Sequence, residues 1–322
     1  MTFATLWLVC MTMSSCTGRT SGQTAPTPKA ETTETVPQDT PDGEEPFPFP
    51  DIPEVMTNPD ERRSYLLQHY WDRYDFADTT LLHRAGVTEQ GLVNYVALVG
   101  THPDRAEADG AVDGFCRKMA AGEQSRQVFA SLLEKYLYDP MSPLRDDALY
   151  VRFLDRLLAH APKEEPLCDR WSFLRELAGR NNPGEAATDF TYYLPDGRKQ
   201  TLYGTPGRQT LLFFYDPECE NCHTTLLEMK ASASLAEAVR AGQVTVLAVY
   251  TEGNPDVWRA RLGEMPEEWI VGTDREAIKT QALYDLKAMP TLYLLDAEKR
   301  VVRKDVAFGQ LAIGNWQLTI SN

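Results

Sequence analysis

The stretch from residue 211 to residue 223, LLFFYDPECENCH, decides the fold of the second half of this chain. Its first five residues are apolar or aromatic and predict a buried strand, which an Asp-Pro pair ends. Cys219 and Cys222 follow, and residues 224–240 predict a helix with one apolar side. At the start of a helix this spacing lets two sulfurs bond across the first turn, and the helix N-terminus favours a thiolate on the first cysteine. The pattern therefore indicates redox chemistry at these two cysteines.

A second signal lies far downstream, in the stretch AMPTLYLLDAEKRVVRKD. Met289, Pro290 and Thr291 precede an apolar strand at 292–295, and a polar turn then leads to another strand from Val301. Taken with the upstream strand, CxxC and helix, this arrangement resembles the thioredoxin superfamily, in its membrane-anchored, periplasmic TlpA/ResA-like branch. The resemblance implies a cis peptide bond at Pro290 facing the CxxC, substrate contacts from Met289 and Thr291, and no cofactor.

The roles of the two cysteines follow from this resemblance. Cys219 is expected to attack a substrate disulfide as the exposed nucleophile, and Cys222 to resolve the mixed disulfide. Acidic residues flank the pair and offset part of the helix effect, which indicates a reductase or isomerase rather than a disulfide donor. Thioredoxin itself has a buried Asp six residues before the first cysteine, where this chain has Phe213. The group that deprotonates Cys222 therefore stays open.

The N-terminal residues indicate export and anchoring. Residues 1–16 are apolar but too short to span a bilayer as a helix, and no Lys or Arg precedes the apolar run. Their last four residues, MSSC, resemble a bacterial lipobox, in which Cys16 is lipidated and becomes the new N-terminus. Residues 17–50 are rich in Thr, Pro, Ser, Gly and Glu and predict a disordered linker. The chain is therefore expected to be a lipid-anchored protein of the cell envelope, facing the periplasm, on either membrane.

Residues 51–182 are predicted to form an all-helical domain, because apolar residues recur at helical spacing throughout. Asn58-Pro59, Thr88 and Ser142-Pro143 are predicted helix starts. The stretches YWDRYDFADTTLL and EKYLYDPMSPLRDDALYVRFL resemble an uncharacterised helical domain that precedes thioredoxin-like modules in some bacterial lipoproteins. That likeness implies an architecture and no activity.

Residues 183–322 are predicted to form an α/β thioredoxin-like domain, with a central mixed sheet flanked by helices. The stretch ATDFTYYLPDGRKQTLY predicts a β-hairpin before the sheet and is similar to the hairpin that opens TlpA-like modules. A buried strand is predicted at 244–250, a helix start at Asn254-Pro255, and a further helix at 275–284.

Composition limits the possible partners. The chain of 322 residues carries a formal charge of −15, which argues against binding to nucleic acid. The expected partners are protein disulfides as substrates, a membrane or periplasmic thiol protein as electron donor, and the lipid anchor. Of the six cysteines, Cys116 and Cys168 have no assigned role. An oxidising compartment would permit a bridge between them, and two buried thiols are the favoured alternative.

Two other interpretations of the motif stay open. CENCH also matches CxxCH, the pattern for covalent haem attachment with His223 as axial ligand. The chain could instead be a partner-binding lipoprotein, in which the helical domain captures a ligand and the thioredoxin-like domain is redox-inactive. A zinc site is disfavoured, because the sequence has no second CxxC or His pair to complete four ligands.

Overall fold

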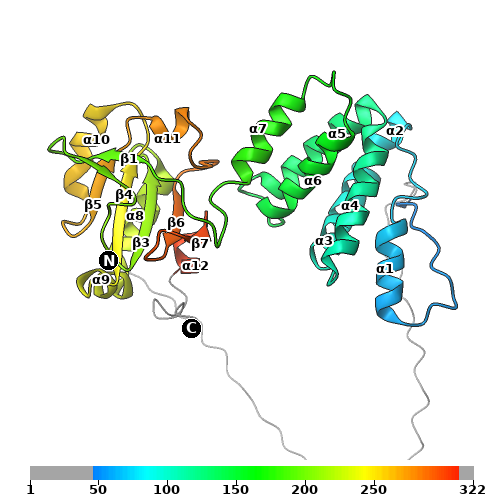
Figure 1. Ribbon diagram of the computed structural model, residues 1–322, viewed down its shortest axis with the longest axis horizontal. Coiled ribbons are helices and arrows are strands. Elements are labelled where there is room, and N and C mark those ends of the chain that lie inside the picture. Colours follow the sequence, from blue (N-terminus) through cyan, green and yellow to red (C-terminus); the bar gives the residue numbers. More distant parts are fainter. Residues whose placement is uncertain (1–45, 312–322) are drawn as a thin grey trace, which may run out of the picture. The chain divides into compact units, whose positions relative to one another are not determined.

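The computed structural model describes residues 46–311, which form a helical region followed by a region built on one sheet (Figure 1). The predicted signal peptide with Cys16, and nearly all of the predicted linker at 17–50, lie outside the described residues. Within the described part of the chain, every helix is too short or too polar to span a bilayer.

The helical region contains the succession of amphipathic helices that the sequence predicts. Its elements are α1 (Pro59–His69), α2 (Thr79–Leu82), the π-helical turn η1 (Ala85–Glu89), α3 (Gln90–Gly100), α4 (Arg105–Ala120), α5 (Glu123–Leu133), the π-helical turn η2 (Glu134–Tyr138), α6 (Asp147–His160) and α7 (Cys168–Ala178). Their apolar faces meet around Trp71, whose ring centroid lies 4.9 Å from that of Phe115 and 5.4 Å from that of Phe129. Burial of these large rings supplies much of the driving force for the fold of this region.

Of the three helix starts predicted in the helical region, the structure confirms one. Asn58 caps α1 as expected, since its side chain accepts the N–H of Asp60 and Pro59 takes the first helical position. The prediction for Thr88 is wrong: this residue lies inside η1, and its buried hydroxyl donates to the carbonyl of Leu81. The prediction for Ser142-Pro143 is also wrong. The Ser142 hydroxyl donates to a turn carbonyl, and α6 begins later, where the Asp146 carboxylate accepts the N–H of Leu149.

The sheet has the strand order β2-β1-β5-β4-β3-β6-β7. Its strands are β1 (Thr191–Tyr193), β2 (Lys199–Thr201), β3 (Gln209–Tyr215), β4 (Val244–Tyr250), β5 (Ile270–Thr273), β6 (Thr291–Leu295) and β7 (Val301–Lys304). Strands β3, β4 and β5 pair in parallel, whereas the hairpin β1–β2 and the strands β6 and β7 pair antiparallel to their neighbours. This is the mixed sheet with an added hairpin that the sequence predicts.

Helices cover both faces of the sheet, and the residues of β3 alternate between two apolar cores. Leu211 and Phe213 pack on the side of α8 (Glu220–Ala231) and α9 (Ala233–Arg240). Leu212 and Phe214 pack on the other side, against Tyr284 and the hairpin. The remaining elements are α10 (Pro255–Arg261), the 3₁₀ turn η3 (Leu262–Glu264), α11 (Ala277–Thr280) and α12 (Phe308–Leu311).

Three details of this region differ from the prediction. The single helix predicted at 224–240 is broken at Ser232, whose extended backbone separates α8 from α9 and whose hydroxyl caps α9. The helix predicted at 275–284 shrinks to α11, because Ala282 takes a positive φ of 50° just beyond it. Strand β5 was not predicted. It is four residues long and includes Gly272, where a Cβ would lie 2.7 Å from the Tyr192 ring.

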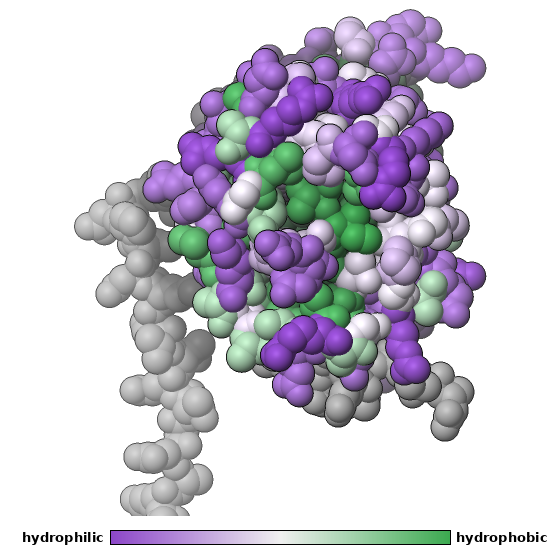
Figure 2. All heavy atoms as spheres, turned by 90° about the vertical axis from the view of Figure 1, so that its left-hand side faces the viewer, coloured by the Kyte–Doolittle hydropathy of each residue, from purple (hydrophilic) through white to green (hydrophobic). Residues whose placement is uncertain are grey.

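Apolar side chains gather in hollows on one face of the molecule, as Figure 2 shows. Two neighbouring hollows of about 660 and 280 Å³ share Gly263, Met265, Pro266 and Trp269. Neither hollow is lined by a cysteine, so the candidate redox residues lie elsewhere on the sheet region.

Candidate redox site

Cys219 lies where the chain leaves β3 and enters α8. Its extended backbone makes it the N-cap residue of α8, and its Sγ accepts the backbone N–H of Cys222 at 3.4 Å. The residue as a whole is half-buried, in contrast to Cys222. The sulfur therefore lies at the positive end of a helix, with a hydrogen-bond donor directed at it.

Cys222 lies one turn into the helix and has a different environment. It is 2% exposed and packs in the apolar core with Leu226 and Phe213. Burial raises the pKa of the Cys222 thiol well above its usual range. Both thiols are free in this structure, and only Cys219 is accessible from outside.

The loop before β6 brings Met289 and Pro290 next to the two cysteines. The Met289–Pro290 peptide bond is cis, as predicted. The carbonyl oxygen of Met289 lies 3.5 Å from Cys219 Sγ and accepts its S–H, although the two residues are 70 positions apart. The structure thus brings together Cys219, Cys222, Met289 and Pro290.

The two residues expected at the substrate differ in exposure. The Met289 side chain is half-buried and packs against both apolar cores of the sheet region. The Thr291 side chain is fully buried, and its hydroxyl donates to the carbonyl of Ala288 at 2.7 Å. The Thr291 side chain is therefore closed to solvent and shapes the loop.

The structure also shows the surroundings of the Cys222 sulfur. Phe213, which replaces the buried acid of thioredoxin, is fully buried and stacks on Tyr215 at 5.3 Å. Among the described residues, the hydrogen bond to Cys222 Sγ comes from the backbone N–H of Asp216, at 3.4 Å. This contact has no signal in the sequence, because its donor is a backbone N–H that any residue would supply. The Asp216 carboxylate itself accepts the N–H of Glu218 and is occupied in the turn.

Cys116 and Cys168 are both free thiols, which agrees with the favoured alternative to a bridge. Cys116 is fully buried, and its Sγ lies 3.6 Å from the carbonyl oxygen of Phe153. Cys168 was expected to be buried and is only half-buried, because it is the first residue of α7 and lies at the rim of the helical core. Within residues 46–311 no three His, Cys, Asp or Glu side chains are grouped as a metal site.

Comparison with known protein families gives one match. Residues 15–181 match a family described as a domain of unknown function (DUF5106). None of the curated proteins matches the chain significantly.

Solved structures match both regions. A thioredoxin-like protein from Bacteroides caccae is 35% identical and covers 84% of this chain and 98% of its own, with a TM-score of 0.74. A conserved protein of unknown function from Bacteroides fragilis is 40% identical over 40% of this chain and 96% of its own, with a TM-score of 0.40. A candidate thiol:disulfide interchange protein, DsbE, from Chlorobium tepidum is 27% identical over 39% of this chain and 86% of its own, with a TM-score of 0.35.

The Bacteroides caccae match is too long to come from the sheet region alone. Coverage of 84% of the chain includes helical and sheet regions together. This chain therefore belongs to the thioredoxin-like proteins, and its residues 15–181 belong to the DUF5106 family.

Proposed function

We propose that this protein is a thiol–disulfide oxidoreductase that acts on protein disulfides through Cys219 and Cys222. One observation carries the proposal: the sulfur of a half-buried cysteine at a helix N-terminus lies 3.5 Å from the carbonyl of Met289, the residue before Pro290. An extended substrate segment beside Met289 and Pro290 can pair with this backbone, which gives binding that tolerates many sequences.

The proposed reaction has two exchange steps. The Cys219 thiolate attacks one sulfur of the substrate disulfide, forms a mixed disulfide and releases the other substrate sulfur, which takes up a proton. Cys222 then loses its proton and attacks Cys219 Sγ, which releases the second substrate thiol and leaves a Cys219–Cys222 disulfide. A dithiol protein, proposed as the membrane or periplasmic electron donor, returns the two electrons.

The proposed direction is reduction or isomerisation rather than disulfide donation. Asp216, Glu218 and Glu220 flank the nucleophile in the sequence. Strong oxidants of this type depend on a stabilised reduced form, and neighbouring carboxylates work against such stabilisation. Covalent haem attachment is disfavoured because Cys222 packs in the apolar core with Phe213 and Leu226, which already occupy the space beside its sulfur.

A disulfide-reduction assay tests the activity. The full chain with a dithiol donor should reduce insulin or glutathione disulfide, and Cys219→Ser should abolish turnover. Cys222→Ser should accumulate a mixed disulfide with substrate, whose partner mass spectrometry can identify. Equal, near-zero rates for wild type and Cys219→Ser would reject the enzyme and favour a partner-binding role for the helical domain.

The anchor and the domain division belong to the same proposal. We propose a signal peptide at 1–16, a linker at 17–50, a helical domain at 51–182 and the thioredoxin-like domain at 183–322. The family match that ends at residue 181 supports the last boundary. Lipidation of Cys16 would hold the protein in the cell envelope, on either membrane, facing the periplasm. Cys16→Ser should then move the protein from the membrane fraction to the soluble fraction, and unchanged fractionation would refute the anchor.

A further inference from the structure

The loop that carries Met289 and Pro290 begins among buried charges. The side chains of Asp285 and Lys287 are 3% and 4% exposed. Lys287 Nζ lies 3.4 Å from Asp285 Oδ2 and 2.5 Å from Oδ1 of Asp147, the first residue of α6. A side chain of the helical region therefore neutralises a lysine that lies two positions before Met289.

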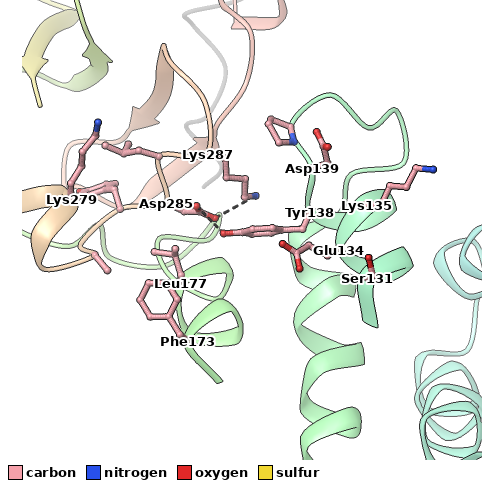
Figure 3. A pocket seen from close by; sticks show the side chains of 14 residues that line it. Ser131, Glu134, Lys135, Tyr138, Asp139, Phe173, Leu177, Lys279, Asp285 and Lys287 are labelled. Atoms are coloured by element: carbon pink, nitrogen blue, oxygen red, sulfur yellow. Dashed lines mark hydrogen bonds and ion pairs between the residues drawn. The ribbon is translucent and has the colours of Figure 1, made fainter. Parts of the chain in front are cut away.

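An aromatic residue of the helical region completes this contact, as Figure 3 shows. Tyr138, the last residue of η2, donates its hydroxyl to Asp285 Oδ1 at 3.0 Å. Lys287 Nζ lies over the Tyr138 ring, 4.0 Å from its centroid. The ring in turn stacks on Tyr150 of α6 at 5.0 Å. Tyr138 thus holds both charged side chains of the loop against the helical core.

The charges of the wider cluster are paired mainly between the two regions, since three of its four ion pairs join a residue of the helical region to one of the sheet region. Its members are three cations and three carboxylates, which we call the junction cluster: Arg145, Asp147, Asp285, Lys287, Lys304 and Asp305. No side chain in the cluster is more than 25% exposed. Lys304 Nζ lies 3.2 Å from Asp147 Oδ2 and also donates to the carbonyl of Ala178, at the end of α7. Because an unpaired buried charge is strongly unfavourable, the two regions are held together here.

Lys287 of the junction cluster lies close in the sequence to the residue that contacts the reactive sulfur. Only Ala288 separates Lys287 from Met289, whose carbonyl contacts Cys219 Sγ at 3.5 Å. On the other side of the loop, the Thr291 hydroxyl holds the Ala288 carbonyl at the start of β6. The loop is therefore held at one end by its own strand and at the other by the helical region.

We propose that Asp147 and Tyr138 are positioning residues, through which the helical domain fixes the Met289–Pro290 loop in front of Cys219. The inference rests on the proposed function. It assigns the helical domain a role in that function, which is to position the loop. The helical domain contributes no reacting atom. It holds Lys287 and Asp285, and through them the backbone that the substrate segment pairs with.

Two variants of the full chain test the role of the anchor. Asp147→Asn keeps the shape of the side chain and removes its charge, and Tyr138→Phe removes only the hydroxyl. Asp155→Asn is the matched control, because Asp155 lies on the same helix and is 43% exposed, with a partner that is also on the helical region. Circular dichroism and the number of titratable thiols establish that each variant is folded.

Substrate kinetics give the first readout. We expect both test variants to raise the KM for a protein disulfide by about tenfold or more, since small misplacements remote from the chemistry can cost up to roughly 100-fold. Their kcat and their active thiol content should stay near those of the wild type, whereas partial unfolding would lower both. Folded Asp147→Asn and Tyr138→Phe proteins with the wild-type KM would overturn the proposal.

Limited trypsin digestion gives a second readout that needs no activity. Trypsin must take the Lys287 side chain into its own pocket, and that side chain is 4% exposed in the intact junction. Cleavage after Lys287 should be slow in the wild type and in Asp155→Asn, and at least about tenfold faster in Asp147→Asn, because the lysine then opens to solvent. If the wild type reduces no disulfide, the proposed function fails. Equal cleavage rates in Asp147→Asn and the wild type would reject the positioning role of Asp147 and leave the proposed function untouched.

Discussion

The buried ion pair between Arg126 and Glu165 provides a quantitative test of what stabilises the helical domain. The two side chains are 9% and 1% exposed, and Arg126 Nε lies 2.8 Å from Glu165 Oε2. Arg126 also donates to the carbonyl of Ala120 at 2.7 Å. Glu165→Ala leaves the guanidinium buried with that carbonyl alone. Removing one partner of a buried pair typically costs about 3–5 kcal/mol, so we expect a loss of unfolding free energy in that range.

A second pair in the same region is the control. Arg175 Nε lies 2.6 Å from Asp155 Oδ1, but the side chains are 46% and 43% exposed. Asp155→Ala should therefore cost at most about 1 kcal/mol, because water screens the pair and solvates the remaining charge. The two pairs differ mainly in burial, since each variant removes a carboxylate that lies at a similar distance from an arginine.

Denaturant unfolding followed by tryptophan fluorescence measures both costs. Trp71 is 3% exposed in the aromatic core and reports on the helical region. Tryptophans lie in both the helical and the sheet region, so two transitions must be fitted separately if the curve resolves them. The double variant Arg126→Met with Glu165→Leu should recover most of the loss, because apolar side chains of similar size need no partner. A cost for Glu165→Ala no larger than that of Asp155→Ala would refute the burial argument.

Two further predictions concern titrating groups. Burial raises the pKa of the Cys116 and Cys222 thiols, so iodoacetamide at pH 8 should label Cys219 in the folded protein and label the other two only after unfolding, as peptide mass spectrometry can measure. Rapid labelling of Cys222 in the native state would contradict its burial. The hydrogen bond from His160, together with Arg117, lowers the pKa of Asp113. A carboxyl group with a lowered folded pKa stabilises the protein above its ordinary pKa and loses that effect as pH falls through the folded value. Asp113→Asn should therefore lower the melting temperature at pH 6, and the difference should shrink below about pH 4. Calorimetry that finds the same difference at every pH would argue against this origin.

The parts of the fold that the sequence could predict are those with strong local signals. The apolar run of β3, the two cysteines and the cap of α10 at Asn254-Pro255 each depend on neighbouring residues alone. Strand β5 has only a weak signal, because it is four residues long and Gly272 interrupts its β-branched residues. The break at Ser232 was missed for a similar reason, since a serine is tolerated inside a helix and only the backbone geometry shows that it caps the next one.

The junction cluster could not be predicted from the sequence at all. Lys287 pairs with Asp147 across 140 positions of the chain, and isolated charged residues in loops are usually solvated. The whole chain carries 47 acidic and 32 basic residues, so a lysine has no shortage of possible surface partners. Burial distinguishes this pair from an ion pair at the surface. A lysine that is 4% exposed and faces a carboxylate from another region fixes the geometry of its own loop, because moving either partner exposes an uncompensated charge.

The position of that lysine explains why the two domains should occur together in one chain. A helical domain with its own aromatic core needs no sheet to bury its apolar faces, and the sheet has apolar cores on both of its faces. The loop before β6 is different, because Lys287 and Asp285 find their remaining partners, Asp147 and Tyr138, only on the helical region. Separating the two regions would therefore leave these three apolar cores intact and release the Met289–Pro290 loop, whose backbone contacts Cys219 Sγ. Separation would therefore weaken substrate binding more than it would lower the free energy of unfolding of either region.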